Sequence, residues 1–328
     1  MRHIIILGIL TTIWLTASAP AHAQQLVKIP RVGYLTGTSV AAPTARIDAF
    51  RQGLREQGYV EGKSIVIAWR GADGKAERLA ALATDLVRLK VDVIVTTGSS
   101  ATRAAKEATL AIPIVMANDS DPIGNGFIAS LARPGGNITG LSTLAPELSG
   151  KRLDLLKEIV PKLARVAVFG SSASLDNAQS LKEVELAAGA VGVKLQYLDV
   201  RDPKDIATAY RAASKERADA VLIMISGAIA LTHQNEIADL AVKHRLPAIY
   251  ERESFVEAGG LLSYGVNRLD LDRRAAVYVG KILKGAKTTD LPVEQPIKFE
   301  FVVNLKAAKA IGLAIPPNVL VRADRVIR

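Results

Sequence analysis

The sequence contains no cysteine and only four histidines. Without cysteine, disulfides, thiolate metal sites, thiol nucleophiles and a lipidated cysteine at a processed N-terminus are all excluded. Of the histidines, only His233 and His244 lie beyond residue 23, and no acidic residue is placed to complete a metal triad with them. We therefore predict no metal site and no catalytic cysteine or histidine. Aromatic residues are also scarce, at 5% of the 328 residues.

Two common signatures of hydrolases are missing as well. There is neither a G-x-S-x-G nucleophile elbow nor a Walker lysine motif. Residues 124–129 (GNGFIA) match G-x-G-x-x-A at the start of an expected short helix, but they follow the fourth expected strand. A dinucleotide fingerprint belongs to the first strand-to-helix turn. We predict no cofactor.

Residues 1–23 have the pattern of a cleaved export signal. Arg2 and His3 precede an uncharged, mostly apolar stretch from Ile4 to Ala19, and Ala21-His22-Ala23 fits a small-x-small cleavage site. The apolar stretch is shorter than the roughly 20 residues that a membrane span needs. We predict cleavage after Ala23 and a location in the periplasm.

The net charge of +10 is spread along the chain. Lysine and arginine are scattered rather than gathered in blocks, and many alternate with acids, as in ERESFVE (251–257). This pattern is typical of a solvated mixed surface rather than of a nucleic-acid footprint. We expect no nucleic-acid partner.

From Pro30 onward, short β-rich runs alternate with helical patterns, which is typical of an α/β fold with parallel sheets. In the first half the expected strands are 31–37, 64–69, 91–98, 112–117 and 137–142, and the expected helices are 44–57, 75–89, 100–109 and a short one near 124–132. The second half repeats this order, with expected strands at 165–170, 192–200, 218–227, 246–255 and 258–265. We predict two similar open, Rossmann-like lobes.

Matching residues support the repeat, since Asp92 and Asp219 lie 127 positions apart and Gly135 and Gly259 lie 124 apart. The Gly-Gly pair of RPGGNITGLS (133–142) thus recurs before the last strand of the second half, which favours a turn over a phosphate-binding loop. The predicted division, with a hinge between the lobes, is 30–141 plus 262–290 for lobe 1 and 142–261 plus 291–328 for lobe 2.

Parallel sheets bind ligands beyond the carboxyl ends of their strands, so two facing lobes would form a binding cleft. Gly98-Ser99-Ser100 opens a helix and suits a carboxylate, although either serine would equally well cap that helix. Asp119 suits an ammonium group, and Asp121 before Pro122 is either a ligand or a helix cap. The candidate ligand-binding residues are Thr38, Ser39, Gly98, Ser99, Ser100, Asn118, Asp119, Asp121, Ser171, Ser172, Ser226, Gly227, Tyr250 and Tyr264.

Several runs carry a family likeness, among them FRQGLREQGYVEG (50–62), SLARPGGNITGLS (130–142) and HRLPAIYERESFVEAGGLLSYG (244–265). With them, residues 31–328 resemble the ABC-transporter substrate-binding family that includes the tryptophan- and tyrosine-binding proteins. The resemblance implies a type I periplasmic-binding-protein fold that closes on a small ligand, such as an amino acid or an aromatic or other small carboxylate. It also implies delivery to an inner-membrane permease and its ATPase, and no reaction; we expect a monomer.

Two other functions fit the same residues. A periplasmic sensor module would present its closed lobes to a membrane receptor, and nothing in the sequence separates this from transport. A two-lobed enzyme is suggested by the closely spaced carboxylates Asp119 and Asp121.

Overall fold

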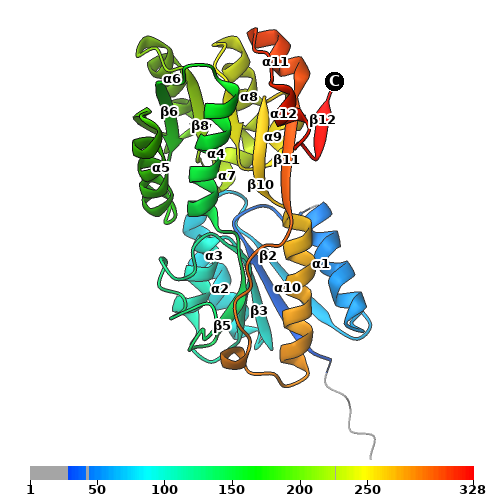
Figure 1. Ribbon diagram of the computed structural model, residues 1–328. Coiled ribbons are helices and arrows are strands. Elements are labelled where there is room, and N and C mark those ends of the chain that lie inside the picture. Colours follow the sequence, from blue (N-terminus) through cyan, green and yellow to red (C-terminus); the bar gives the residue numbers. More distant parts are fainter. Residues whose placement is uncertain (1–28, 42–43, 226) are drawn as a thin grey trace, which may run out of the picture.

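The computed structural model describes residues 29–41, 44–225 and 227–328, so the predicted export signal lies outside the described residues. Two lobes are stacked end to end, each with a sheet between layers of helices (Figure 1). The predicted α/β class with two similar lobes is confirmed.

The first lobe has a five-stranded parallel sheet in the order β2-β1-β3-β4-β5. Its strands are β1 (Arg31–Thr36), β2 (Val66–Gly71), β3 (Val93–Thr97), β4 (Ile114–Asp119) and β5 (Ile138–Ser142). Its helical segments are α1 (Ala45–Glu56), η1 (Ala76–Arg78), α2 (Leu79–Arg88), α3 (Ser99–Ala108), α10 (Arg268–Leu283) and η2 (Thr288–Asp290).

Both faces of this sheet are buried, which explains the continuous apolar strands. Alternate side chains of β3 belong to different clusters: Val93 and Val95 lie with residues of α1 and α10, and Ile94 lies with residues of α2 and α3. The period of two along the strand produces this division.

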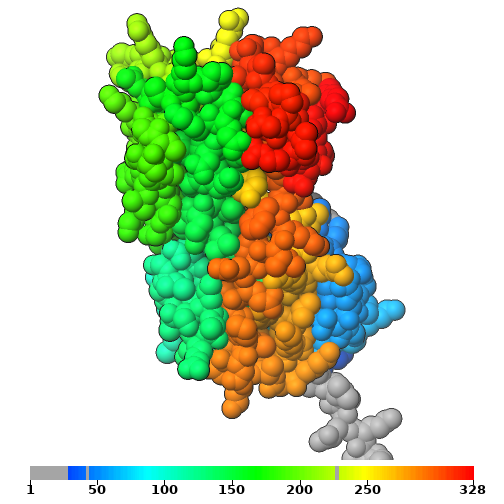
Figure 2. Space-filling model, viewed as in Figure 1, coloured from blue at the N-terminus to red at the C-terminus, as the bar shows by residue number. Residues whose placement is uncertain are grey.

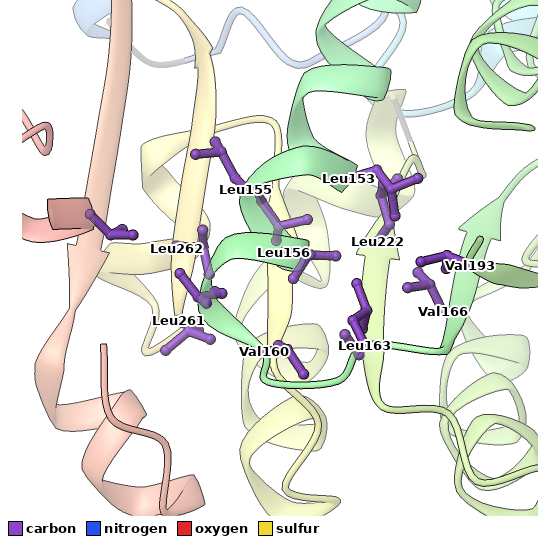
Figure 3. Close-up of a cluster of buried hydrophobic side chains, with 14 of the residues drawn as sticks. Leu153, Leu155, Leu156, Val160, Leu163, Val166, Val193, Leu222, Leu261 and Leu262 are labelled. Atoms are coloured by element: carbon purple, nitrogen blue, oxygen red, sulfur yellow. The ribbon is translucent and has the colours of Figure 1, made fainter. Parts of the chain in front are cut away.

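The second lobe has a seven-stranded sheet in the order β12-β11-β10-β9-β8-β6-β7, with β10 and β11 antiparallel. Its strands are β6 (Arg165–Gly170), β7 (Lys194–Asp199), β8 (Ala220–Ile223), β9 (Ala248–Tyr250), β10 (Leu262–Val266), β11 (Phe299–Asn304) and β12 (Arg325–Ile327). Its helices are α4 (Ala145–Ile159), α5 (Asn177–Val191), α6 (Pro203–Lys215), α7 (Gly227–Thr232), α8 (Gln234–Lys243), α9 (Glu253–Glu257), α11 (Leu305–Ile311) and α12 (Pro317–Leu320). Leu153, Leu155 and Leu156 of α4 share one buried cluster with Leu222 of β8 and Leu262 of β10 (Figure 3).

The internal repeat is confirmed by the strand order. The series β7-β6-β8-β9-β10 of the second lobe matches β2-β1-β3-β4-β5 of the first. The last two strands, β11 and β12, extend the second sheet alone.

The predicted lobe boundaries need two corrections. β10 pairs with β9 and β11, so 262–266 belongs to lobe 2, as its equivalence to β5 requires. Residues 291–294 stay with lobe 1, where Val293 N donates to the Leu131 carbonyl and Leu291 packs in the first-lobe core. The chain therefore crosses between lobes after β5, after β10 and again between residues 294 and 299, where it runs up the front of the molecule (Figure 2).

The short helix expected near 124–132 is absent from this described stretch, which consists of turns. Asp121 Oδ1 accepts a hydrogen bond from Gly124 N at 2.9 Å and closes a tight turn instead of capping a helix. The dinucleotide-like residues 124–129 thus open no helix. Gly135 has φ +84°, so the expected turn before β5 is confirmed.

Candidate functional site

A cavity of about 200 Å³ lies between the two lobes, where the parallel strands end. Segments after β1, β3 and β4 line it from the first lobe, and segments after β6, β8 and β9 line it from the second. It occupies the position at which the strand ends predict a cleft. A cavity of this size suits a small organic molecule.

Hydroxyl groups dominate the first-lobe wall. Thr36, after which β1 ends, has an Oγ1 that accepts a hydrogen bond from Thr97 Oγ1 at 2.7 Å and lies 3.0 Å from Thr38 Oγ1. Ser99 Oγ lies 2.7 Å from Ser120 Oγ. These side chains hold one another in place and present a neutral, polar surface.

The first turn of α3 faces the cavity. Gly98 is the N-cap residue, with φ +85° and no side-chain cap, and the lining continues through Ser99 and Ser100 to Ala101. The proposed capping role of the two serines is therefore not what the structure shows. A helix N-terminus of this kind favours a negatively charged ligand group.

Two carboxylates, Asp119 of the first lobe and Asp176 of the second, are linked through the side-chain amide of Asn125. Asp119 is fully buried at the end of β4, and its Oδ1 accepts a hydrogen bond from Asn125 Nδ2 at 3.2 Å. The same Nδ2 donates to Oδ1 of Asp176 in the second lobe at 3.0 Å. Burial, together with the negative charge of Asp176, raises the pKa of Asp119 to about 7. Asp176 lines the cavity, whereas Asp119 lies behind its wall.

Charged residues that were not predicted line another part of the cavity: Arg46, Arg152, Glu251, Arg252 and Arg268. Glu251 and Arg252 begin ERESFVE, yet their side chains are only 15% and 14% exposed. The interpretation of this run as a solvated surface is wrong at these two positions, because both follow β9 into the cavity.

The arginines differ in their partners. Arg46 forms a bidentate ion pair with the fully buried Asp272, at 2.6 and 2.9 Å. Arg252 Nε donates to Glu251 Oε1 at 2.7 Å, and Arg268 Nη2 lies 3.4 Å from the same oxygen. Burial alone would raise the pKa of Glu251, but the surrounding guanidinium groups, Arg252 first, lower it to about 2.

Of the predicted ligand-binding residues, the structure brings Thr38, Gly98, Ser99, Ser100 and Asn118 to the cavity wall. Nδ2 of Asn118 is buried and has no hydrogen-bond partner among the described residues.

The two predicted tyrosines lie elsewhere. Tyr250 is fully buried in the second-lobe core, stacked on Phe255 with ring centroids 4.8 Å apart. Tyr264 stacks on Phe299 at 6.1 Å, beside the crossing after β10. Neither tyrosine lines the cavity.

Ser39, Asp121, Ser171 and Ser172 also lie off the described cavity wall. Ser172 Oγ donates to Asp199 Oδ2 at 2.6 Å, and Ser171 N donates to Asn177 Oδ1 at 3.1 Å, so both serve the loop after β6. Ser39 Oγ accepts from Ala41 N at 3.3 Å, and Asp121 closes its own turn. Ser226 lies outside the described residues, and Gly227 begins α7.

Nothing in the described ranges groups three or more histidine, aspartate or glutamate side chains as a metal would require. His233 and His244 instead flank α8 at its two ends. As for membrane spans, none of the described helices combines the length and the apolar character that crossing a bilayer takes.

Comparisons with known proteins agree with this architecture. A family model described as ABC transporter substrate binding protein matches residues 38–327. The Tyrosine-binding protein of Clostridioides difficile strain R20291 is 24% identical over 264 residues, which cover 80% of this chain and 75% of that protein.

Two solved structures are similar along nearly their whole length. A conserved domain protein from Vibrio cholerae is 27% identical with a TM-score of 0.84, covering 91% of this chain and 100% of that one. An ABC domain in complex with L-Trp from Streptococcus pneumoniae is 26% identical with a TM-score of 0.83, covering 91% and 99%.

Proposed function

Because the chain belongs to the family of ABC transporter substrate binding proteins, we propose that it is an exported receptor that captures one small organic molecule and delivers it to a permease and its ATPase. The observation that carries the proposal is the cavity lined by strand ends of both lobes. A ligand that contacts both lobes stabilises their closed arrangement over an open one. Binding, with no reaction, is the proposed activity.

The lobes have the contacts that such closure needs. Asn125 of the first lobe donates to Asp176 of the second at 3.0 Å, beside the cavity. Three crossing segments connect the lobes and would act as the hinge, and closure would bury the ligand between Ser99 and Asp176. A closed receptor of this kind presents both lobes together to a membrane partner.

For the ligand we propose an amino acid or another small carboxylate. The first turn of α3 suits a carboxylate, and Asp176 would accept a hydrogen bond from an amino group. Relatives named for tyrosine and crystallised with L-Trp support this class. No aromatic side chain lines the described cavity, so a ring would contact Leu79, Met224 and Leu231 instead.

Export to the periplasm remains a prediction from residues 1–23. Cell fractionation followed by N-terminal sequencing tests it, and the expected mature chain begins at Gln24. A chain retained in the cytoplasm with residues 1–23 intact would contradict it.

Ligand binding is tested by thermal-shift screening of amino acids and aromatic acids, followed by calorimetry. We expect at least one of them to raise the melting temperature, since a ligand that binds only the folded state stabilises it. Asp176→Ala should weaken binding by about tenfold or more, since it removes a charged partner of the ligand. Asp48→Ala, at a 62% exposed side chain outside the cavity, is the matched control and should have no effect. No binding by any amino acid or aromatic acid would contradict the proposed ligand class.

A further inference from the structure

Guanidinium groups outnumber carboxylates on the cavity wall formed by α4, the end of β9 and the start of α10. Arg152, Arg252 and Arg268 share this wall with one acid, Glu251. The fourth arginine, Arg46, is neutralised by its ion pair with Asp272. The wall therefore carries two positive charges in excess.

Hydrogen bonds within the protein leave part of this wall unsatisfied. Arg152 directs Nε to the Tyr264 carbonyl at 2.7 Å and Nη1 to Ser149 Oγ at 3.2 Å. Arg268, by contrast, has only the 3.4 Å contact with Glu251, and its buried Nε has no hydrogen-bond partner within the described chain. A buried charge that lacks a partner costs free energy.

The electrostatics of Arg268 agree with this geometry. Burial and the neighbouring charge of Arg252 lower the pKa of Arg268 to about 9, although Glu251 acts in the opposite direction. An anionic partner would relieve both effects. Arg252 and Arg268 have side chains only 14% and 20% exposed, so water screens them weakly.

We propose that the ligand has a net negative charge and places a carboxylate or phosphate group between Arg252 and Arg268. This inference rests on the proposed function of the cavity. The planar fork of arginine matches the paired oxygens of such groups. A ligand of this kind supplies the countercharge that Glu251 alone does not.

The sheet order also indicates the length of the ligand. β9, which Arg252 follows, and β6, which precedes Asp176, are separated by β8, so their ends lie about 10 Å apart at about 4.8 Å per strand. An acidic group separated from a hydrogen-bond donor by several bonds fits this distance.

Calorimetry with matched ligands tests the proposal. The sets are L-glutamate with L-glutamine, 3-(4-hydroxyphenyl)propionate with L-tyrosine, and O-phospho-L-serine with L-serine; the last distinguishes phosphate from carboxylate. In at least one set the net anionic member should bind about tenfold more tightly than its neutral partner, as expected for one added charge-assisted contact.

Substitutions of Arg268 and Glu251 test whether the preference for an anionic ligand arises at this wall. Arg268→Gln should reduce the affinity for the anion by about tenfold or more and that for the neutral partner by less than about threefold. Glu251→Gln should increase the affinity for the anion, because it removes the competing carboxylate. Arg88→Gln, at an exposed position outside the cavity, is the control of equal charge change.

The outcomes separate this inference from the proposed function. If in every set that binds the neutral member binds at least as tightly as its anionic partner, and Arg268→Gln leaves that affinity unchanged, the receptor function stands and the anionic ligand is wrong. An equal loss of affinity for both members of a set in Arg268→Gln also contradicts the inference. If no member of any set binds and the thermal-shift screen finds only neutral ligands, the anionic ligand is wrong and the receptor function stands; if the screen also finds no ligand, the proposed ligand class fails together with this inference.

Discussion

Two carboxylates lie at the ends of equivalent strands in the two lobes, the fully buried Asp119 and the largely buried Glu251, and their surroundings shift their pKa values in opposite directions. At the end of β4, burial and a neighbouring acid raise the pKa of Asp119 to about 7. After β9, three arginines outweigh burial and lower the pKa of Glu251 to about 2. The ends of two equivalent strands thus have the same scaffold but opposite electrostatics, and each is set in part by a charge from the other lobe, Asp176 beside Asp119 and Arg268 beside Glu251.

The amino ends of the strands have not diverged in this way. Asp92 Oδ2 accepts a hydrogen bond from Arg31 N at 2.8 Å in the first lobe, and Asp219 Oδ2 accepts one from Arg165 N at 2.8 Å in the second. The repeat therefore retains its structural contacts at one edge of each sheet. Its chemistry differs at the other edge, where parallel sheets bind ligands.

The largest expected effect concerns a close backbone approach that both lobes share. A Cβ on Gly140 of β5 would lie 2.2 Å from the Met116 carbonyl oxygen, and one on Gly265 of β10 would lie 2.0 Å from the Glu251 carbonyl oxygen. We expect Gly140→Ala and Gly265→Ala each to lower the free energy of unfolding by about 4 kcal/mol or more, because backbone must move. Urea denaturation measures both.

Gly136→Ala is the matched control, since its Cβ would meet nothing within 4 Å. If either Gly140→Ala or Gly265→Ala resembled this control, the two lobes would not share the constraint.

A second, smaller effect is the opposite pH dependence that Asp119 and Glu251 give to the free energy of unfolding. The folded state binds the proton of Asp119 more tightly than the unfolded state does, so stability falls as pH rises from about 4 to about 7 and then levels off. We expect Asp119→Asn to remove this decline and to raise the free energy of unfolding at pH 8 by about 3 kcal/mol. Urea denaturation between pH 4 and pH 8 measures the difference.

Glu251→Gln should behave in the opposite way. The lowered pKa of Glu251 contributes stability that is present above about pH 4.5 and is lost as pH falls toward 2. The variant should therefore lose about 2 kcal/mol at pH 7 and become less sensitive to acid. Parallel pH profiles for the two variants would contradict the opposite electrostatics of the two strand ends.

Most of the scaffold is predictable from the sequence because apolar strands and repeated residues report on local structure. Asp92 and Asp219 recur at the start of equivalent strands, and each serves the same backbone contact. The lobe boundary was harder to predict because β10 lies immediately before α10, so adjacent residues belong to different lobes. The absent helix near 124–132 follows from the local turn that Asp121 closes.

The charged wall of the cavity could not be predicted in the same way. Arg152, Glu251 and Arg268 converge from α4, the end of β9 and α10, and no spacing in the chain records that convergence. Alternating charge suggested a surface at 251–257, a pattern that holds for Glu253 and Glu257 but not for Glu251. Glu251 directly follows the buried strand β9, and this position is the signal that could have distinguished it from Glu253 and Glu257.

The smallest expected effect concerns the retained contacts at the amino ends of the strands. Asp92→Ala and Asp219→Ala each remove a carboxylate that accepts backbone hydrogen bonds near solvent, so each should lower the free energy of unfolding by about 1 kcal/mol. Because the two sites lie in different lobes, the double variant should show the sum of the two losses. Urea denaturation of the single and double variants, with exposed Asp48→Ala as the control, measures this. A cost confined to one lobe would mean that the matching contacts are a similarity of sequence without an equal structural role.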